Sequence, residues 1–150
     1  NTSVPGFASF SNNLVTLYSI ADAFNHQADI DLFCFYENTT SHVNLMTLAA
    51  PGSNITGIFG GDYDPSNYTT KNVTYFSKTT LTAAEFDAVS NDAVILASFD
   101  PNNKFKKAKL LTAGEVYAIK LQSGKYGLLK IAAVTGTEDG TLEFAAKIQK

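Results

Sequence analysis

The sequence predicts a mainly β domain of the α+β class, with an antiparallel sheet that forms a sandwich or a partly open barrel and carries two short helices. Three observations support this prediction: a period-two pattern in the last third, an apolar run at residues 30–36, and two segments that open with helix-capping residues. A chain of 150 residues with 45% hydrophobic residues can bury about 70% of its unfolded surface in one core. We therefore expect a single β-rich domain over residues 7–150, preceded by a flexible leader at residues 1–6.

Residues 114–150 predict a three-stranded antiparallel meander. β-branched and aromatic residues fill 116–121 and 126–134, and the Ser123-Gly124 pair between them is a turn signal. Both strands are apolar on both faces, so we expect the middle strand of the meander to be buried on both sides.

The turn also predicts the register of this hairpin. With Ser123 and Gly124 as a two-residue turn, Ile119 faces Leu128 and Val116 faces Ile131. The last strand, residues 141–149, alternates apolar and polar side chains at period two, which predicts one solvent-exposed face.

The first fifty residues predict two hairpins joined by a short helix. The expected elements are strands at 7–10 and 14–18 around an Asn12-Asn13 turn, a helix capped by Ser19 through Ala21 to Phe24, and strands at 30–36 and 43–48. Because the 30–36 strand is apolar on both faces, we expect it at the centre of a sheet.

The middle of the chain predicts a second strand and helix. A strand at 73–76 is followed by a helix at 83–90, for which Thr82 and Glu85 form a Thr-x-x-Glu capping box. The apolar run 93–99 predicts a further strand. This order resembles that of residues 15–36, and it is explained either by an old duplication or by two similar solutions to one packing problem.

Composition argues against several functions. The net charge is −3 and all basic residues are lysines, so the arginine contacts and basic stripe typical of nucleic-acid binding are missing. Cys34 is the only cysteine, which we interpret as a buried apolar residue rather than a reactive thiol. The chain lacks Gly-x-Ser-x-Gly, His-Glu-x-x-His, a P-loop and Gly-x-Gly-x-x-Gly. The spacing of His26 and His42 does not predict a metal or haem site. We expect a non-enzymatic protein without a cofactor.

The longest irregular stretch, residues 49–70, predicts a functional loop. Glycine and proline interrupt it, and loops this long in a compact domain are usually functional. Tyrosine offers an apolar face and a hydroxyl, which suits ligand contact. The candidate ligand-binding residues are Phe59, Asp62, Tyr63, Asp64, Asn67 and Tyr68. A solvated insertion is the alternative. A calcium loop of the EF-hand type is disfavoured, because its twelfth position, counted from Asp62, is Val73 rather than an acid.

Five short strings give the chain a family resemblance. They are Ala-Asp-Ile-Asp-Leu at 28–32, Leu-Ala-Ala-Pro at 48–51, Thr-Ala-Ala-Glu-Phe-Asp-Ala at 82–88, Gly-Glu-Val-Tyr-Ala-Ile-Lys at 114–120 and Gly-Lys-Tyr-Gly-Leu-Leu-Lys at 124–130. Together they resemble small secreted or lipid-anchored lipoproteins of the Bacteroidetes, over most of residues 14–150. The resemblance implies an exported β-rich protein of uncharacterised function, at the bacterial cell surface or in the periplasm. It also implies a membrane tether through a lipidated N-terminal residue that has been removed, and it transfers no catalytic residue.

We therefore expect a non-enzymatic exported binding or adhesion module that holds a glycan or protein ligand through the 55–70 loop. The alternative is a structural or accessory subunit that docks on an exported partner by an exposed strand edge. A more remote alternative is a small hydrolase. Asp29 and Asp31 lie at period two on one strand face, but acid–base catalysis would require them to be buried with perturbed pKa values.

Overall fold

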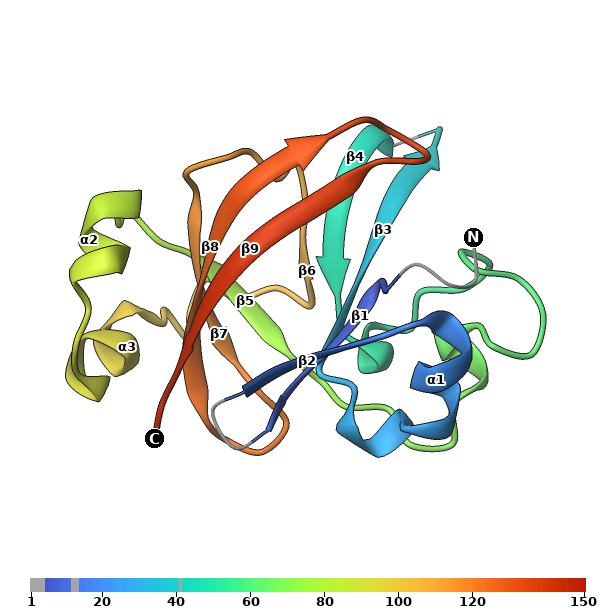
Figure 1. Ribbon diagram of the computed structural model, residues 1–150, viewed down its shortest axis with the longest axis horizontal. Helices are drawn as coiled ribbons and strands as arrows, with labels where there is room; N and C mark the ends of the chain where they lie inside the picture. Colours follow the sequence, from blue (N-terminus) through green and yellow to red (C-terminus); the bar gives the residue numbers. More distant parts are fainter. Residues whose placement is uncertain (1–4, 12–13, 41) are drawn as a thin grey trace.

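Two antiparallel sheets stacked face to face form the middle of the molecule (Figure 1). The structure is a computed structural model, and it describes residues 5–11, 14–40 and 42–150. The strands are β1 (Phe7–Ser11), β2 (Leu14–Tyr18), β3 (Leu32–Thr39), β4 (His42–Ala49), β5 (Tyr75–Lys78), β6 (Lys107–Ala108), β7 (Val116–Lys120), β8 (Tyr126–Thr135) and β9 (Thr141–Ile148). The helices are α1 (Ile20–Asn25), α2 (Ala83–Ala88) and α3 (Asp92–Ser98), with short 3-10 helices η1 (Gln27–Asp29), η2 (Pro51–Ser53) and η3 (Pro65–Asn67). The predicted fold class is confirmed.

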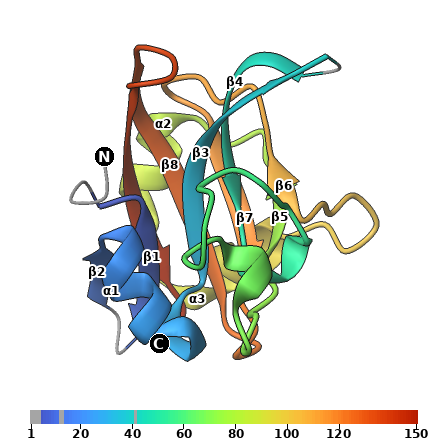
Figure 2. The same cartoon turned by 90° about the vertical axis from the view of Figure 1, so that its right-hand side faces the viewer.

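The strand order explains which strands are buried. The five-stranded sheet has the order β2-β1-β3-β4-β6, and the four-stranded sheet has the order β5-β7-β8-β9. Every described pairing is antiparallel. Strand β3 lies in the middle of its sheet, as its apolar character on both faces predicted (Figure 2). The described strands form two open sheets, so the fold is a sandwich and not a closed barrel.

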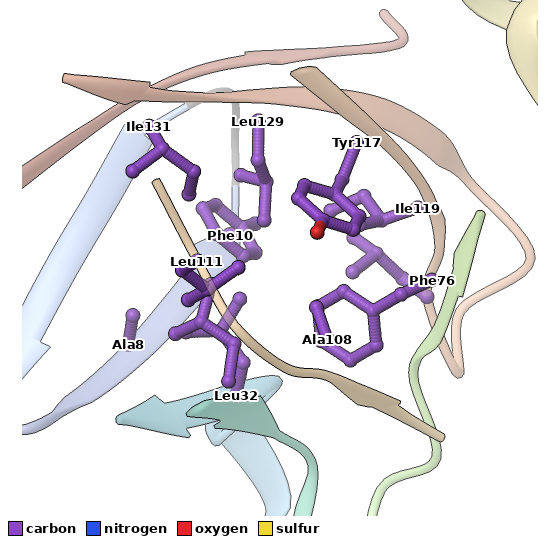
Figure 3. Packing of buried hydrophobic residues seen from close by; sticks show 12 residues of the cluster. Ala8, Phe10, Leu32, Phe76, Ala108, Leu111, Tyr117, Ile119, Leu129 and Ile131 are labelled. Atoms are coloured by element: carbon purple, nitrogen blue, oxygen red, sulfur yellow. The ribbon is translucent and has the colours of Figure 1, made fainter. Parts of the chain in front are cut away.

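The main core lies between the two sheets, where alternate side chains of both meet (Figure 3). Its buried members are Ala8, Phe10, Leu32, Leu48, Phe76, Ala108, Leu111, Tyr117, Ile119, Leu121, Leu129 and Ile131. Successive side chains of a strand point to opposite faces, so the neighbours of these residues point outward and need a second cover.

Each sheet has such a cover on its outer face. The outer face of the five-stranded sheet, with Phe7, Phe33 and Phe35, is covered by α1 and by the irregular segment after β4. The outer face of the four-stranded sheet is covered by α2 and α3, through Phe86 and Ile95 (Figure 1). The domain therefore has four layers, with both sheets in the interior.

The C-terminal meander is confirmed, but the predicted register of its first hairpin is wrong by one residue. Val116 lies opposite Lys130 rather than Ile131. The N–H of Gly124 donates to the carbonyl of Leu121 at 3.0 Å, and Gly124 has a φ of +87°. The loop thus has three residues with a left-handed glycine at its end, so Gln122 belongs to the turn and every pair shifts by one.

The first hairpin and its helix also follow the prediction. β1 pairs with β2 from Phe7 opposite Tyr18 to Ser11 opposite Leu14. The predicted Asn12-Asn13 turn lies outside the described residues. Helix α1 begins after Ser19, whose hydroxyl oxygen accepts the N–H of Asp22 at 3.2 Å.

The predicted strand at 93–99 is wrong, because these residues form α3. The side chain of Asn91 accepts the N–H of Val94 at 3.2 Å and caps the helix. Ile95 and Phe99 are buried while Leu96 is 44% exposed, which is the spacing of one helical face. The described residues therefore form three α-helices rather than the two predicted. Helix α2 has the predicted capping box, in which the Thr82 oxygen accepts the N–H of Glu85 at 3.2 Å.

This correction also affects the internal resemblance between the two halves. The second segment is a strand followed by two helices, whereas the first is a strand, a helix and a strand. Strand β5 begins at Tyr75, two residues after the predicted start, and Phe105 forms an isolated antiparallel bridge with Phe76. The expected strand–helix–strand repeat is thus not present in residues 73–99. Within the described part of the chain, no helix is long and apolar enough to cross a membrane.

Candidate functional site

The 55–70 loop lies against the outer face of the five-stranded sheet (Figure 2). The ring of Phe59 lies 5.1 Å from that of Phe7 and 5.7 Å from that of Phe33, measured between centroids. Ile55 and Ile58 pack beside it. This half of the loop therefore continues the hydrophobic core, and Phe59 is mainly a packing residue.

Asp64 organises the loop from within. It is 3% exposed, and its carboxylate accepts the N–H groups of Ser66 at 2.9 Å, Ile58 at 3.1 Å and Phe59 at 3.3 Å. Burial raises the pKa of Asp64, but these hydrogen bonds outweigh it and hold the pKa below its ordinary value. Because its oxygens are engaged, Asp64 is a structural residue. Among the described residues, no group of three or more histidine, cysteine or acidic side chains could hold a metal ion.

Tyr68 is buried as well, whereas the other three candidates are exposed. Tyr68 is 3% exposed and its hydroxyl has no hydrogen-bond partner among the described residues; burial raises its pKa to about 12, with Asp64 contributing. Asp62, Tyr63 and Asn67 face solvent, and Tyr63 is 43% exposed. The structure thus separates the six predicted residues into three that pack the loop and three that remain accessible.

Two hollows of the described surface lie outside the loop, around the β7–β8 turn. One of them, which we call the carboxylate hollow, has a volume of about 430 Å³ and opens to solvent. It lies where β1, η1, the segment after the loop and the β7–β8 turn come together. Its lining residues are Ser9, Phe10, Ser11, Ala28, Asp29, Asp31, Asn72, Gln122, Ser123 and Lys125.

Asp31 is the most strongly fixed group of this hollow. Its Oδ2 accepts the N–H of Phe10 at 2.7 Å, its own N–H donates to Ala8 at 2.9 Å, and its carbonyl accepts the hydroxyl of Thr74 at 2.7 Å. Burial raises the pKa of Asp31 above its ordinary value of 3.8; the Phe10 N–H partly opposes this, and nearby Asp29 raises the pKa further. The hollow thus contains a half-buried carboxyl group held by two neighbouring segments.

The loop end and η1 form one wall of the hollow. The Asn72 amide donates to the carbonyls of Ala28 at 2.8 Å and Ile30 at 3.1 Å. The Gln27 side-chain oxygen accepts the N–H of Thr69 at 2.6 Å. These bonds fix the C-terminal end of the loop to the segment that carries both aspartates.

A second hollow adjoins the first across Gln122. This lysine hollow has a volume of about 450 Å³ and is lined by Val73, Tyr75, Lys104, Lys120, Leu121, Gln122 and Gly124. The Gln122 side-chain oxygen accepts the N–H of Val73 at 3.0 Å, so this side chain is part of the wall between the two hollows. The Lys104 ammonium lies 4.9 Å from the Tyr75 ring centroid.

Sequence reasoning missed most of this site. The sequence pairs Asp29 and Asp31 at period two, but it does not predict that Asp31 is half-buried. Gln122 and Lys125 lie in the predicted meander, where the pattern predicts a hairpin and no binding site. The polar Ser123-Gly124 turn is the only hint in the sequence that residues 122–125 could contact a ligand. Nothing in the sequence places this turn beside Asp29 and Asp31.

Comparisons with known proteins agree with the fold. A crystal structure of a DUF4466 family protein from Parabacteroides merdae, a member of the Bacteroidetes, matches with a TM-score of 0.65 and 17% identity. The likeness is one of fold. It covers 100% of this chain and 51% of the other, so this chain spans about half the length of that uncharacterised protein. No family model matches the chain, and no curated protein matches it.

Proposed function

We propose that the protein is a non-enzymatic binding module that holds a hydroxyl-rich ligand, of the glycan class, in the carboxylate hollow. The observation that carries this proposal is the half-buried Asp31, held by the Phe10 N–H at 2.7 Å and facing a hollow of about 430 Å³. The volume of this hollow lies in the range of ligand sites, and most of its lining residues are polar, which suits a hydroxyl-rich ligand. The proposal places the ligand beside the 55–70 loop rather than on it.

The chemistry of the lining favours a glycan. Asp29 and Asp31 supply acceptors, while Lys125 and the hydroxyl of Ser123 supply donors. A sugar with neighbouring hydroxyl groups both donates and accepts, so it can satisfy both kinds of group. Two aspartates against one lysine among the lining residues disfavour an anionic ligand.

Binding to a glycan array, followed by titration of the strongest oligosaccharide, tests this proposal. We expect Asp29→Asn and Lys125→Ala to weaken binding at least about tenfold, since each removes a polar contact worth about 1.4 kcal/mol or more. The matched control is Tyr63→Ala, which removes an exposed side chain of the loop and is expected to leave the affinity unchanged. Binding that survives both hollow variants and fails in the control refutes the proposal, and so does a hit on a peptide array alone.

A second candidate, a small hydrolase, is favoured by one observation. The pKa of Asp31 is raised, mainly by burial, and the Asp29 carboxylate lines the same hollow, so two carboxyl groups are available for acid–base chemistry. Mass spectrometry of the bound oligosaccharide after incubation separates the two functions. An unchanged oligosaccharide supports binding alone, whereas shortened products that disappear in Asp31→Asn assign catalysis.

Export is part of the proposal. Its support is the resemblance of the sequence to Bacteroidetes lipoproteins. Cell-surface or periplasmic fractionation of the native host, with labelling by a radioactive fatty acid, tests location and the lipid tether together. Recovery in the cytosolic fraction without label contradicts both.

A further inference from the structure

Strand β2 is an apolar strand at an open end of the five-stranded sheet. It has the sequence Leu-Val-Thr-Leu-Tyr and contains no charged residue. Its exposed fractions are 67% for Leu14, 43% for Val15 and 55% for Leu17. These side chains lie on both faces of the strand, because successive residues point to opposite sides. The strand thus presents apolar surface on each face and an edge that pairs with no described strand.

The other three sheet ends are protected, which makes β2 an exception. Strand β6 has only two residues, and Lys107 is one of them. Strand β5 carries Lys78 and is bridged on its outer side by Phe105. Strand β9 carries Glu143 and Lys147. Short length, charge and cover are the devices by which sheets avoid pairing with another chain. Strand β2 has five uncharged residues, and no other described strand covers its outer edge.

We propose that two copies of this chain associate through β2, in an antiparallel pair centred on Thr16. In this register, Thr16 lies opposite Thr16 of the second copy, Val15 lies opposite Leu17, and Leu14 lies opposite Tyr18. The two five-stranded sheets then form one continuous sheet across a two-fold axis. The further inference is independent of the glycan site.

The symmetry of the strand favours a second copy as the occupant. A two-fold interface must be self-complementary, and β2 places an apolar residue opposite an apolar residue at each step away from Thr16. Threonine pairs with threonine at the axis, which is a favourable cross-strand pair. Because β2 has no charge, doubling it juxtaposes no like charges. A second copy is a different occupant from the exported partner that the sequence analysis considers.

Strand β2 is held in place by its pairing with β1. It pairs with β1 over its whole length, from Leu14 opposite Ser11 to Tyr18 opposite Phe7. β1 is in turn buried on both faces, with Phe7 and Ala8 each 1% exposed. A second strand can therefore add to a preformed edge without ordering a flexible segment.

Sedimentation equilibrium between micromolar and several hundred micromolar protein tests the association. We expect a monomer–dimer equilibrium for the wild type and a dissociation constant at least about tenfold higher for Val15→Lys, because desolvating a charge at the interface is costly. Val15→Lys with Leu17→Glu restores the dimer at low salt, since the register places the two new charges opposite each other. Leu96→Lys, on exposed α3, is the matched control and leaves the dimer intact.

A cysteine scan tests the register itself. Thr16→Cys lies on the two-fold axis, so a mild oxidant is expected to convert it quantitatively into a disulfide-linked dimer. Val15→Cys lies opposite Leu17 of the second copy and is not expected to cross-link. The wild type, oxidised under the same conditions, measures any cross-linking through Cys34. Two results of the sedimentation experiment overturn the proposal: a wild type that is monomeric at every concentration, and a dimer that Val15→Lys leaves unchanged. In the cysteine scan, a Val15→Cys variant that cross-links as fast as Thr16→Cys overturns it.

Discussion

Replacing Asp64 by alanine is expected to destabilise the whole domain by about 4 kcal/mol. The carboxylate accepts three backbone N–H groups, and a hydrogen bond to a charged group contributes roughly 1.5–3 kcal/mol. The three bonds share one side chain and are not additive, so we take about half of their upper sum. For a chain of 150 residues, this free energy lowers the melting temperature by about 10 °C.

The chain has no tryptophan whose fluorescence could follow unfolding. Circular dichroism during thermal and urea unfolding therefore measures this loss of stability. Asp62→Ala, two residues earlier in the same loop, is the control. Its side chain is exposed, and we expect a change within about 0.5 kcal/mol. Equal effects of the two substitutions would refute the structural role of Asp64, and a stable Asp64→Ala that loses glycan binding would show that Asp64 contacts the ligand.

The pH dependence supplies a second test of Asp64. Hydrogen bonds hold its pKa below the ordinary value of 3.8, despite the opposing effect of burial. A depressed pKa contributes stability above pH 3.8 that is lost as the pH falls through the pKa of the folded state. Asp64→Asn is therefore expected to flatten the acid limb of the stability curve. A limb of unchanged steepness would contradict the assignment.

Two further predictions concern the core. Gly127→Ala is expected to lower the free energy of unfolding in urea by about 1–3 kcal/mol, because its new Cβ would lie 2.5 Å from Ile148 Cδ1 and 3.1 Å from the Lys147 carbonyl. Ser123→Ala is the control, and equal stability of the two variants would contradict the close packing around Gly127. Burial raises the pKa of Cys34 to about 12. Alkylation of this thiol by iodoacetamide at pH 8 should therefore be slow in the folded protein and fast in urea. Equal alkylation rates in both states would show that the thiol is accessible in the folded protein.

The parts of the fold that follow from local patterns were predictable. Alternation at period two identified the last strand, and the Thr82 and Glu85 capping box identified α2, because both depend only on neighbouring residues. The run at 93–99 was misread, since a short apolar run has no clear period; Asn91 was the deciding residue. The hairpin register failed for a similar reason: one more residue in the turn shifts every pair.

The candidate site was less predictable, because burial is decided by tertiary packing. Asp64 and Tyr68 resemble ligand contacts in the sequence, yet each is 3% exposed in the fold. Conversely, Asp31 and Lys125 lie far apart in the chain, and they line the same hollow because β1, the segment before β3 and the β7–β8 turn come together in the fold. The sequence shows which polar residues the chain contains, but it does not show which of them lie next to one another.

Hydrogen-exchange mass spectrometry with the strongest oligosaccharide from the array tests the central claim most directly. The carboxylate hollow predicts that binding slows exchange in residues 27–31 and 121–126, which carry Asp29, Asp31 and Lys125. Residues 60–68 serve as the internal reference, since none of them lines the hollow. Protection confined to residues 60–68, with none at 27–31 and 121–126, would contradict the account.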